Sequence, residues 1–132
     1  MSKIKKNILL VDDDVDYLFQ KKLELEKEGF NVFTAHSIKP ARKILEEMQI
    51  DLAIVDLMMQ EKDDGFVLSY QIKSSWPKTP VIMVTGVTAQ TGLEFDTITE
   101  NEKKWIKADT IFTKPVRAEQ LVREIRRLLA NE

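Results

Sequence analysis

The chain contains no cysteine among its 132 residues. Disulfide bonds, thiolate nucleophiles and cysteine metal sites are therefore excluded. The one histidine, His36, is expected in a loop after the second strand of the fold. No Ser–His nucleophile pair and no Walker-type phosphate loop are available. Chemistry on this chain therefore has to rest on carboxylates, hydroxyls and amines.

Long apolar runs and a dominant sign of charge are also missing. The formal net charge of −2 gives no general case for binding nucleic acid. The basic segment 1–7 is followed by an apolar run that stops at Asp12, too short for a signal peptide and far too short to span a bilayer. With 43% hydrophobic and 32% charged residues, the composition is typical of a soluble globular protein of one domain.

Five β-rich apolar runs recur along the chain, near residues 8–12, 30–35, 50–56, 80–85 and 109–113. Three of them are continuously apolar rather than alternating, which is typical of strands buried on both faces. Strands that alternate with helices predict one parallel sheet with helices on both sides. We expect the doubly wound order 2-1-3-4-5, a flavodoxin-like three-layer α/β sandwich. In that order ligands bind beyond the carboxyl ends of the first and third strands.

The segments between these runs carry the signals of amphipathic helices. Asp14 is expected at the start of the first helix, in a capping or dipole role. Ser37 is expected to cap the second helix, with Met48 among its inward-facing residues. The last helix, over 121–129, has an apolar face opposite three arginines. The segment 88–107 is less regular, and we expect an altered or extended fourth helix there.

Three aspartates end two of the apolar runs. Asp12 and Asp13 follow the first run, and Asp56 closes the third. If these runs are neighbouring parallel strands, all three carboxylates emerge at one edge of the sheet. At roughly 5 Å and an effective dielectric of about 20, each pair repels by about 3 kcal/mol. This cost indicates that the cluster is kept for chemistry, and oxygen ligands of this kind suit a hard divalent cation.

Two further residues end strands at the same edge. Thr85 follows the fourth apolar run and Lys114 follows the fifth. Three carboxylates, a hydroxyl and an ammonium together could handle a phosphoryl group, because a divalent ion, the hydroxyl and the lysine can each meet a phosphate oxygen. One carboxylate would then be the nucleophile, through an aspartyl-phosphate intermediate.

With these residues in place, the chain resembles the receiver (CheY-like) domain of two-component response regulators. The resemblance covers about residues 6–130 of what we expect to be a single receiver domain, 1–132. Any one of its motifs is weak, but five in this order at strand ends are specific. The motifs are ILLVDDD at 8–14, LAIVDLMM at 52–59, DGF at 64–66, VIMVTG at 81–86 and FTKP at 112–115.

The resemblance implies a metal site. Asp12 and Asp13 match the acidic pair that holds Mg²⁺, and Mn²⁺ would also fit such ligands. Asp13 and Asp56 are the implied direct ligands, with Asp12 acting through water. Met58 would supply a backbone carbonyl to the same ion.

The resemblance also implies a phosphoryl site. Asp56 matches the phosphoacceptor, and Thr85 and Lys114 match the hydroxyl and the lysine that contact the phosphoryl group. The bond between Lys114 and Pro115 is typically cis in this family, which would aim the lysine inward.

The function implied is that of a phosphoacceptor in a two-component phosphorelay. Asp56 would receive a phosphoryl group, with Mg²⁺, from the phosphohistidine of a sensor histidine kinase or a histidine phosphotransfer protein, or from a small acyl phosphate. Phosphorylation would switch the face formed by residues 85–114 for an output partner or effector domain, and residues 86–114 could also form a homodimer. Such a protein is a cytoplasmic signalling receiver, which catalyses only its own phosphorylation and dephosphorylation. No membrane or direct nucleic-acid contact is expected.

Some positions depart from the family pattern. Gln60 stands where a proline is usual, and the loop before Gly65 is one residue longer. Ile111 stands where many members carry an aromatic rotamer switch, and Phe112 beside it is expected to face the core. The stretch between the hydroxyl and lysine positions is also longer than usual.

Two other functions stay open on the residues alone. One is a receiver-like interaction module that acts without phosphorylation, which the irregular loop 60–64, Ile111 and the long segment 86–107 favour. The other is a small metal-dependent phosphatase with an aspartyl nucleophile. Phosphatases of the haloacid-dehalogenase type carry Asp-x-Asp-x-Thr/Val on the first strand, whereas the corresponding segment 12–16 ends in aspartate. The chain also leaves no room for the cap domain of such enzymes.

Overall fold

Five parallel strands form one sheet in the order β2-β1-β3-β4-β5. The computed structural model describes residues 5–57, 64–86 and 108–130. The strands are β1 (Asn7–Val11), β2 (Asn31–Ala35), β3 (Leu52–Asp56), β4 (Val81–Thr85) and β5 (Thr110–Thr113). The described helices are α1 (Val15–Lys27), α2 (Ile38–Glu47), α3 (Asp64–Ser75) and α5 (Ala118–Ala130). The predicted strands and their order are therefore confirmed.

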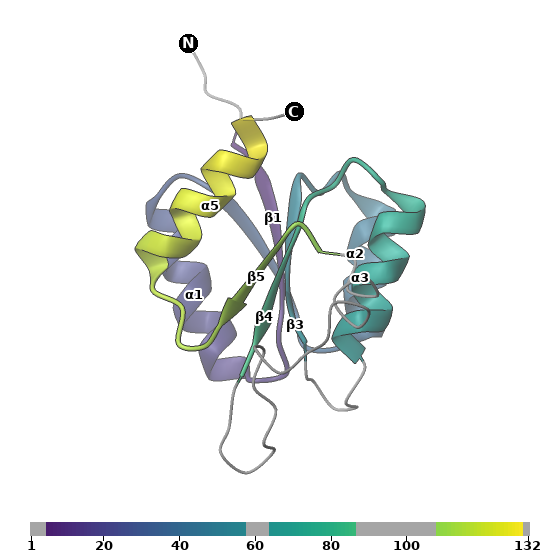
Figure 1. Ribbon diagram of the computed structural model, residues 1–132, viewed down its shortest axis with the longest axis horizontal. Coiled ribbons are helices and arrows are strands. Elements are labelled where there is room, and N and C mark those ends of the chain that lie inside the picture. Colours follow the sequence, from purple (N-terminus) through teal and green to yellow (C-terminus); the bar gives the residue numbers. More distant parts are fainter. Residues whose placement is uncertain (1–4, 58–63, 87–107, 131–132) are drawn as a thin grey trace.

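Helices cover the sheet on both sides, which makes three layers (Figure 1). Alternate residues of each strand enter two separate cores, as the period of a strand requires. In β1, Ile8 and Leu10 pack with α1 and α5, whereas Leu9 and Val11 pack with α2 and α3. Because both faces of β1, β3 and β4 are buried, these strands are apolar at successive positions.

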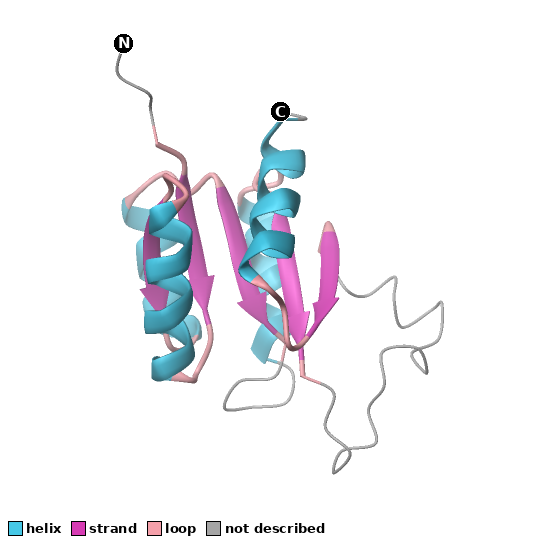
Figure 2. Cartoon of the chain, turned by 90° about the vertical axis from the view of Figure 1, so that its left-hand side faces the viewer, coloured by secondary structure: helices cyan, strands magenta, loops and turns pink. Residues whose placement is uncertain are grey.

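The start and end of α1 follow from particular residues. The side chain of Asp14 accepts a hydrogen bond from the backbone N–H of Tyr17, at 3.2 Å, which caps the helix as predicted. Gly29 follows the helix with a φ of +96°, a conformation that side chains disfavour. All five strands run in the same direction, so α1 begins at the carboxyl edge of the sheet, directly after β1 (Figure 2).

Two predictions about α2 need correction or qualification. Ser37 occupies the N-cap position, but its side chain makes no capping hydrogen bond. Met48 does not face inward and is 38% exposed. The reason is that α2 ends at Glu47, so Met48 has an extended backbone and no longer follows the helical period.

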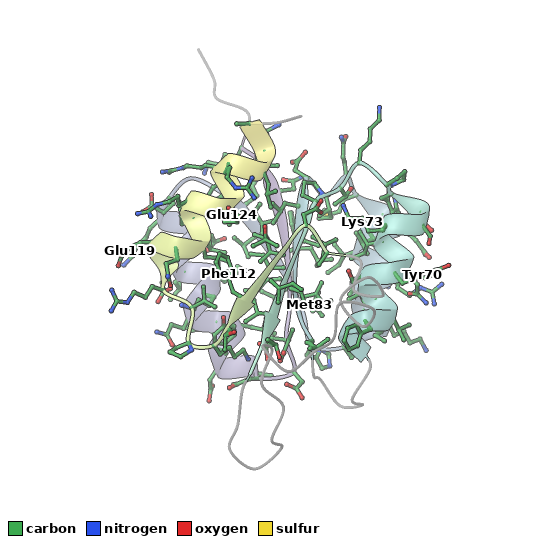
Figure 3. All side chains as sticks on the ribbon, viewed as in Figure 1. Tyr70, Lys73, Met83, Phe112, Glu119 and Glu124 are labelled. Atoms are coloured by element: carbon green, nitrogen blue, oxygen red, sulfur yellow. The ribbon has the colours of Figure 1, made fainter. Side chains whose placement is uncertain are left out.

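The remaining predictions are partly tested. Phe112 packs against the core formed with α1 and α5, and Figure 3 shows it on that side of the sheet. The expected fourth helix, over 88–107, lies outside the described residues. No described helix has the length and apolar character needed to cross a bilayer.

Candidate functional site

Asp12, Asp13 and Asp56 converge at the carboxyl edge of the sheet. Each offers one carboxylate oxygen within 4.8 Å of the oxygens of the other two. The register explains this, because Val11 pairs with Val55 and the next residue of each chain segment is an aspartate. Asp12 is 2% exposed and Asp56 is 5% exposed, whereas Asp13 is exposed. The cluster therefore reaches the surface through Asp13.

Backbone hydrogen bonds continue past the strand ends and fix this edge. The N–H of Asp12 donates to the carbonyl of Ala35 at 3.1 Å, and the N–H of Leu57 donates to that of Val84 at 2.8 Å. The N–H of Lys114 donates to the carbonyl of Thr85, also at 2.8 Å. The residues that carry the polar side chains are thus held in place by hydrogen bonds that extend the sheet.

Lys114 reaches two of the three carboxylates. Its ammonium lies 3.0 Å from Oδ2 of Asp12 and 3.5 Å from Oδ2 of Asp56. Burial lowers the pKa of Lys114, but the hydrogen bond to Asp12 and the negative charges of Asp56 and Asp12 outweigh it, so the pKa lies above its ordinary value. The lysine is therefore charged at neutral pH. The peptide bond between Lys114 and Pro115 is cis.

Asp12 is held by the chain on both of its oxygens. Oδ1 accepts the backbone N–H of Asp14 at 2.9 Å, and Oδ2 accepts from Lys114. A carboxylate engaged in this way is well suited to orient its neighbours. It has less capacity to bind an ion directly.

Thr85 ends β4, between the strands that carry Asp56 and Lys114. Val84 pairs with Asp56, so Thr85 lies one residue beyond Asp56 along the carboxyl edge. Thr85 pairs with Thr113, so Lys114 lies one residue beyond Thr85 on the neighbouring strand. Thr85 is buried. Met58, the implied source of a backbone carbonyl, lies outside the described residues.

Gly65 joins the start of α3 tightly to the end of β3. Its N–H donates to the carbonyl of Leu57 at 3.1 Å. A Cβ at Gly65 would overlap the backbone of Asp56 and Leu57, with no flexible side chain to give way. Only glycine fits at this approach.

Sequence reasoning missed two residues of α1 that lie beside the site. The ammonium of Lys114 is 4.6 Å from the ring centroid of Tyr17, and that of Lys21 is 5.7 Å from the same ring. Lys21 is buried and donates to the carbonyl of Val116 at 3.0 Å. The available signal was their spacing of four residues on a helix that begins at the acidic edge.

The hydroxyl of Tyr17 is a neutral group in this setting. Burial raises the pKa of Tyr17, and the positive charge of Lys114 opposes this only in part. The nearby acids Asp12 and Asp56 raise it further. The ring beside Lys114 therefore carries no charge at neutral pH.

The donor set fits a hard divalent cation. Three carboxylates at this spacing offer oxygen ligands, and one of them is exposed so that an ion can enter. The shared ammonium of Lys114 neutralises only part of their charge. Cysteine is absent from the chain, so a soft-metal thiolate site is excluded.

Residues 8–126 match the family described as the response regulator receiver domain. The chain is 34% identical over 122 residues to the heme response regulator HssR of Staphylococcus aureus strain MRSA252, which covers 92% of this chain and 50% of HssR. The chain therefore spans half the length of that relative.

Two solved structures agree with this match. A response regulator receiver domain protein (CheY-like) from Methanospirillum hungatei JF-1 has a TM-score of 0.81 and 27% identity, covering 97% of this chain and 96% of that one. A receiver domain protein from Clostridium thermocellum has a TM-score of 0.80 and 30% identity, covering 96% and 95%.

Apart from Asn7, the matched region includes all five strands, together with most of α5, and the strand order is that of the CheY-like fold. The acidic cluster lies at the carboxyl edge of that sheet, where open α/β sheets bind their ligands. The chain belongs to the response regulator receiver domain family.

Proposed function

We propose that the chain accepts a phosphoryl group on Asp56 from the phosphohistidine of a sensor histidine kinase or a histidine phosphotransfer protein. A small acyl phosphate would serve as an alternative donor. The observation that carries the proposal is the convergence of three carboxylate oxygens within 4.8 Å, with the Lys114 ammonium in contact with two of the acids. A bond forms between an Asp56 oxygen and phosphorus, the P–N bond breaks, and its electron pair stays on the imidazole nitrogen.

Asp13 and Asp56 are the proposed direct ligands of Mg²⁺ or Mn²⁺, with Asp12 acting through water and Met58 supplying a backbone carbonyl. The hydrogen bonds that occupy both oxygens of Asp12 support its indirect role. A bound divalent ion would offset the negative charge that the phosphoryl group brings to an already acidic site.

Lys114 and Thr85 are the proposed phosphoryl contacts. Lys114 already neutralises part of the charge on Asp56. It would pair with a phosphoryl oxygen once Asp56 is phosphorylated, since formation of the acyl phosphate removes the negative charge from the carboxylate. The Thr85 hydroxyl would donate to another phosphoryl oxygen. Movement of Thr85 towards the phosphoryl group would in turn move the loop that follows β4.

The output of the switch is proposed to be the binding of a partner or effector domain to the face of residues 85–114. Formation of a homodimer through residues 86–114 is a further proposal. Residues 87–107 lie outside the described structure, so the support for both comes from the position of Thr85 at the start of that segment.

The direct test is mass measurement of the intact protein after incubation with Mg²⁺ and acetyl phosphate. The wild type should gain one phosphoryl group, and Asp56→Asn should gain none. Asp51→Asn is the matched control, because Asp51 precedes the same strand at the opposite edge of the sheet. An unmodified wild type at saturating donor, or equal uptake by Asp56→Asn, would refute the proposal.

A second candidate function is an interaction module that works without phosphorylation. The observation that favours it is Ile111, which packs with the Leu57–Met83 cluster in the place of an aromatic switch. This candidate predicts that a phosphoryl mimic such as beryllofluoride with Mg²⁺ leaves oligomeric state and partner affinity unchanged. A measurable change in either property would exclude it.

A further inference from the structure

The aromatic ring of Tyr17 forms one wall around the ammonium of Lys114. The distance of 4.6 Å from Nζ to the ring centroid is within the range of a cation–π contact. The same ammonium is 3.0 Å from Asp12 and 3.5 Å from Asp56. Lys114 therefore has two acidic neighbours and one aromatic neighbour.

Tyr17 is itself fixed by the acidic edge. It lies in the first turn of α1, and its N–H donates to the side chain of Asp14 at 3.2 Å. The N–H of Asp14 in turn donates to Oδ1 of Asp12 at 2.9 Å. The acid that accepts from Lys114 thus also fixes the helix that presents the ring to it.

Lys21 anchors the backbone after Lys114 by a hydrogen bond, although its ammonium also lies 5.7 Å from the centroid of the Tyr17 ring. One turn beyond Tyr17, its ammonium donates to the carbonyl of Val116 at 3.0 Å and contacts Glu24 at 3.1 Å. Helix α1 therefore holds the segment 114–116 at two points, one on the Lys114 side chain and one on the main chain. Loss of the ring alone leaves the main-chain contact in place.

The face of the ring, rather than the hydroxyl, makes the contact with Lys114. The Tyr17 hydroxyl oxygen is buried and makes no hydrogen bond within the part of the chain that the structure describes. A phenylalanine at this position would keep the contact, and an aliphatic side chain would lose it.

We propose that Tyr17 is a positioning residue whose ring face keeps the Lys114 ammonium directed into the acidic cluster. The inference rests on the proposed phosphoryl transfer to Asp56. Lysine has a long, flexible side chain, so its ammonium occupies one place only when several neighbours hold it. The neutral ring attracts the cation without forming a salt bridge. Lys114 can therefore leave a carboxylate for a phosphoryl oxygen while its contact with the ring persists.

The first experiment measures the contact in the protein without metal or donor. Protons of the Lys114 side chain that lie over an aromatic face shift upfield in NMR spectra. We expect this shift in the wild type and in Tyr17→Phe, and its loss in Tyr17→Leu. Tyr70→Phe is the matched control, because Tyr70 is the other tyrosine and is exposed on α3. Lys114 shifts that are the same in Tyr17→Leu and the wild type would overturn the proposal.

The second experiment measures the rate of phosphoryl uptake from acetyl phosphate with Mg²⁺. Tyr17→Leu should be slower than the wild type by about three- to tenfold, which is the range for loss of one partly buried cation–π contact. Tyr17→Phe should stay within about twofold of the wild type. Equal rates for Tyr17→Leu and wild type, or equal slowing by Tyr17→Phe and Tyr17→Leu, would overturn the positioning role.

Folding of each variant is checked by thermal unfolding, and Tyr17→Met replaces Tyr17→Leu in both experiments if the leucine variant does not fold. The two experiments also separate this proposal from the one on which it rests. A wild type that takes up no phosphoryl group refutes transfer to Asp56. The proton shifts still decide whether the ring holds the lysine.

Discussion

At the amino ends of β4 and β5, one acid meets one base. Oδ2 of Asp109 lies 2.6 Å from the ammonium of Lys73 and accepts the N–H of Val81 at 2.8 Å. At the carboxyl ends of β1 and β3, Asp12 and Asp56 instead share the Lys114 ammonium, and Asp13 adds a third carboxylate within 4.8 Å. Among these described side chains, the charges balance in the Asp109–Lys73 pair and leave a negative excess in the cluster of Asp12, Asp13, Asp56 and Lys114.

The contrast separates acids that serve the fold from acids that serve a ligand. A paired acid such as Asp109 joins α3 to the start of β4 and β5, and its charge is neutralised by Lys73 without a bound cation. A cluster of like charges raises the free energy of the folded state until a cation enters. An acidic residue is therefore expected to raise the free energy of unfolding at one edge and to lower it at the other. Substitution of the acids can measure this difference.

The largest difference is expected from removing the base at each edge. Lys114→Met leaves Asp12, which is almost fully buried, without its ammonium, and should lower the free energy of unfolding by about 3 kcal/mol. Lys73→Met breaks a pair whose side chains are 21% and 35% exposed, and should cost about 1 kcal/mol. Urea unfolding without divalent ions measures both. Equal losses would show that burial does not distinguish the two edges.

A smaller difference, but one of opposite sign, is expected from removing an acid. Asp13→Asn relieves repulsion within the cluster and should raise the free energy of unfolding by about 1 kcal/mol in the absence of metal. Asp109→Asn removes the partner of Lys73 and should lower it by about 1 kcal/mol. Urea unfolding of the two variants is the measurement. Destabilisation by Asp13→Asn would mean that the cluster is already neutralised within the protein.

The smallest effect concerns a second balanced network, which joins β5 to α5. Hydrogen bonding to Arg127 lowers the pKa of Glu124 from 4.5 to about 2, with a further hydrogen bond from Thr110. A depressed pKa contributes stability that is complete above pH 4.5 and is lost as the pH falls towards 2. Glu124→Gln should therefore flatten the acid side of the stability profile between these two values. An unchanged profile in thermal unfolding at stepped pH would contradict the ion pair.

Much of the fold could be predicted from sequence because its strands are buried on both faces. Continuous apolar runs such as Leu52–Val55 mark parallel strands, and parallel strands bring their carboxyl ends together. Asp12, Asp13 and Asp56 could be grouped for this reason, without knowledge of any side-chain contact. Their roles as metal ligands and phosphoacceptor stay predictions.

The contacts of α1 could not be predicted in the same way. Lys21 meets Val116 across 95 positions of sequence, and that meeting depends on the rotation of α1 about its axis. Periodicity gives only an approximate rotation, and it treats a lysine on the inner face as a misplaced polar residue. The error at Met48 has a similar origin, because a helix that stops one residue earlier releases its last side chain.

The close approach at Gly65 has a mechanical consequence. Gly65, at the start of α3, packs directly against the backbone of Asp56 and Leu57. There is therefore no free space in which the end of β3 could move without moving α3. A displacement of Asp56 on the proposed phosphorylation would therefore be transmitted directly to α3. Its outer residues, which include the exposed Tyr70 in Figure 3, would move with the helix.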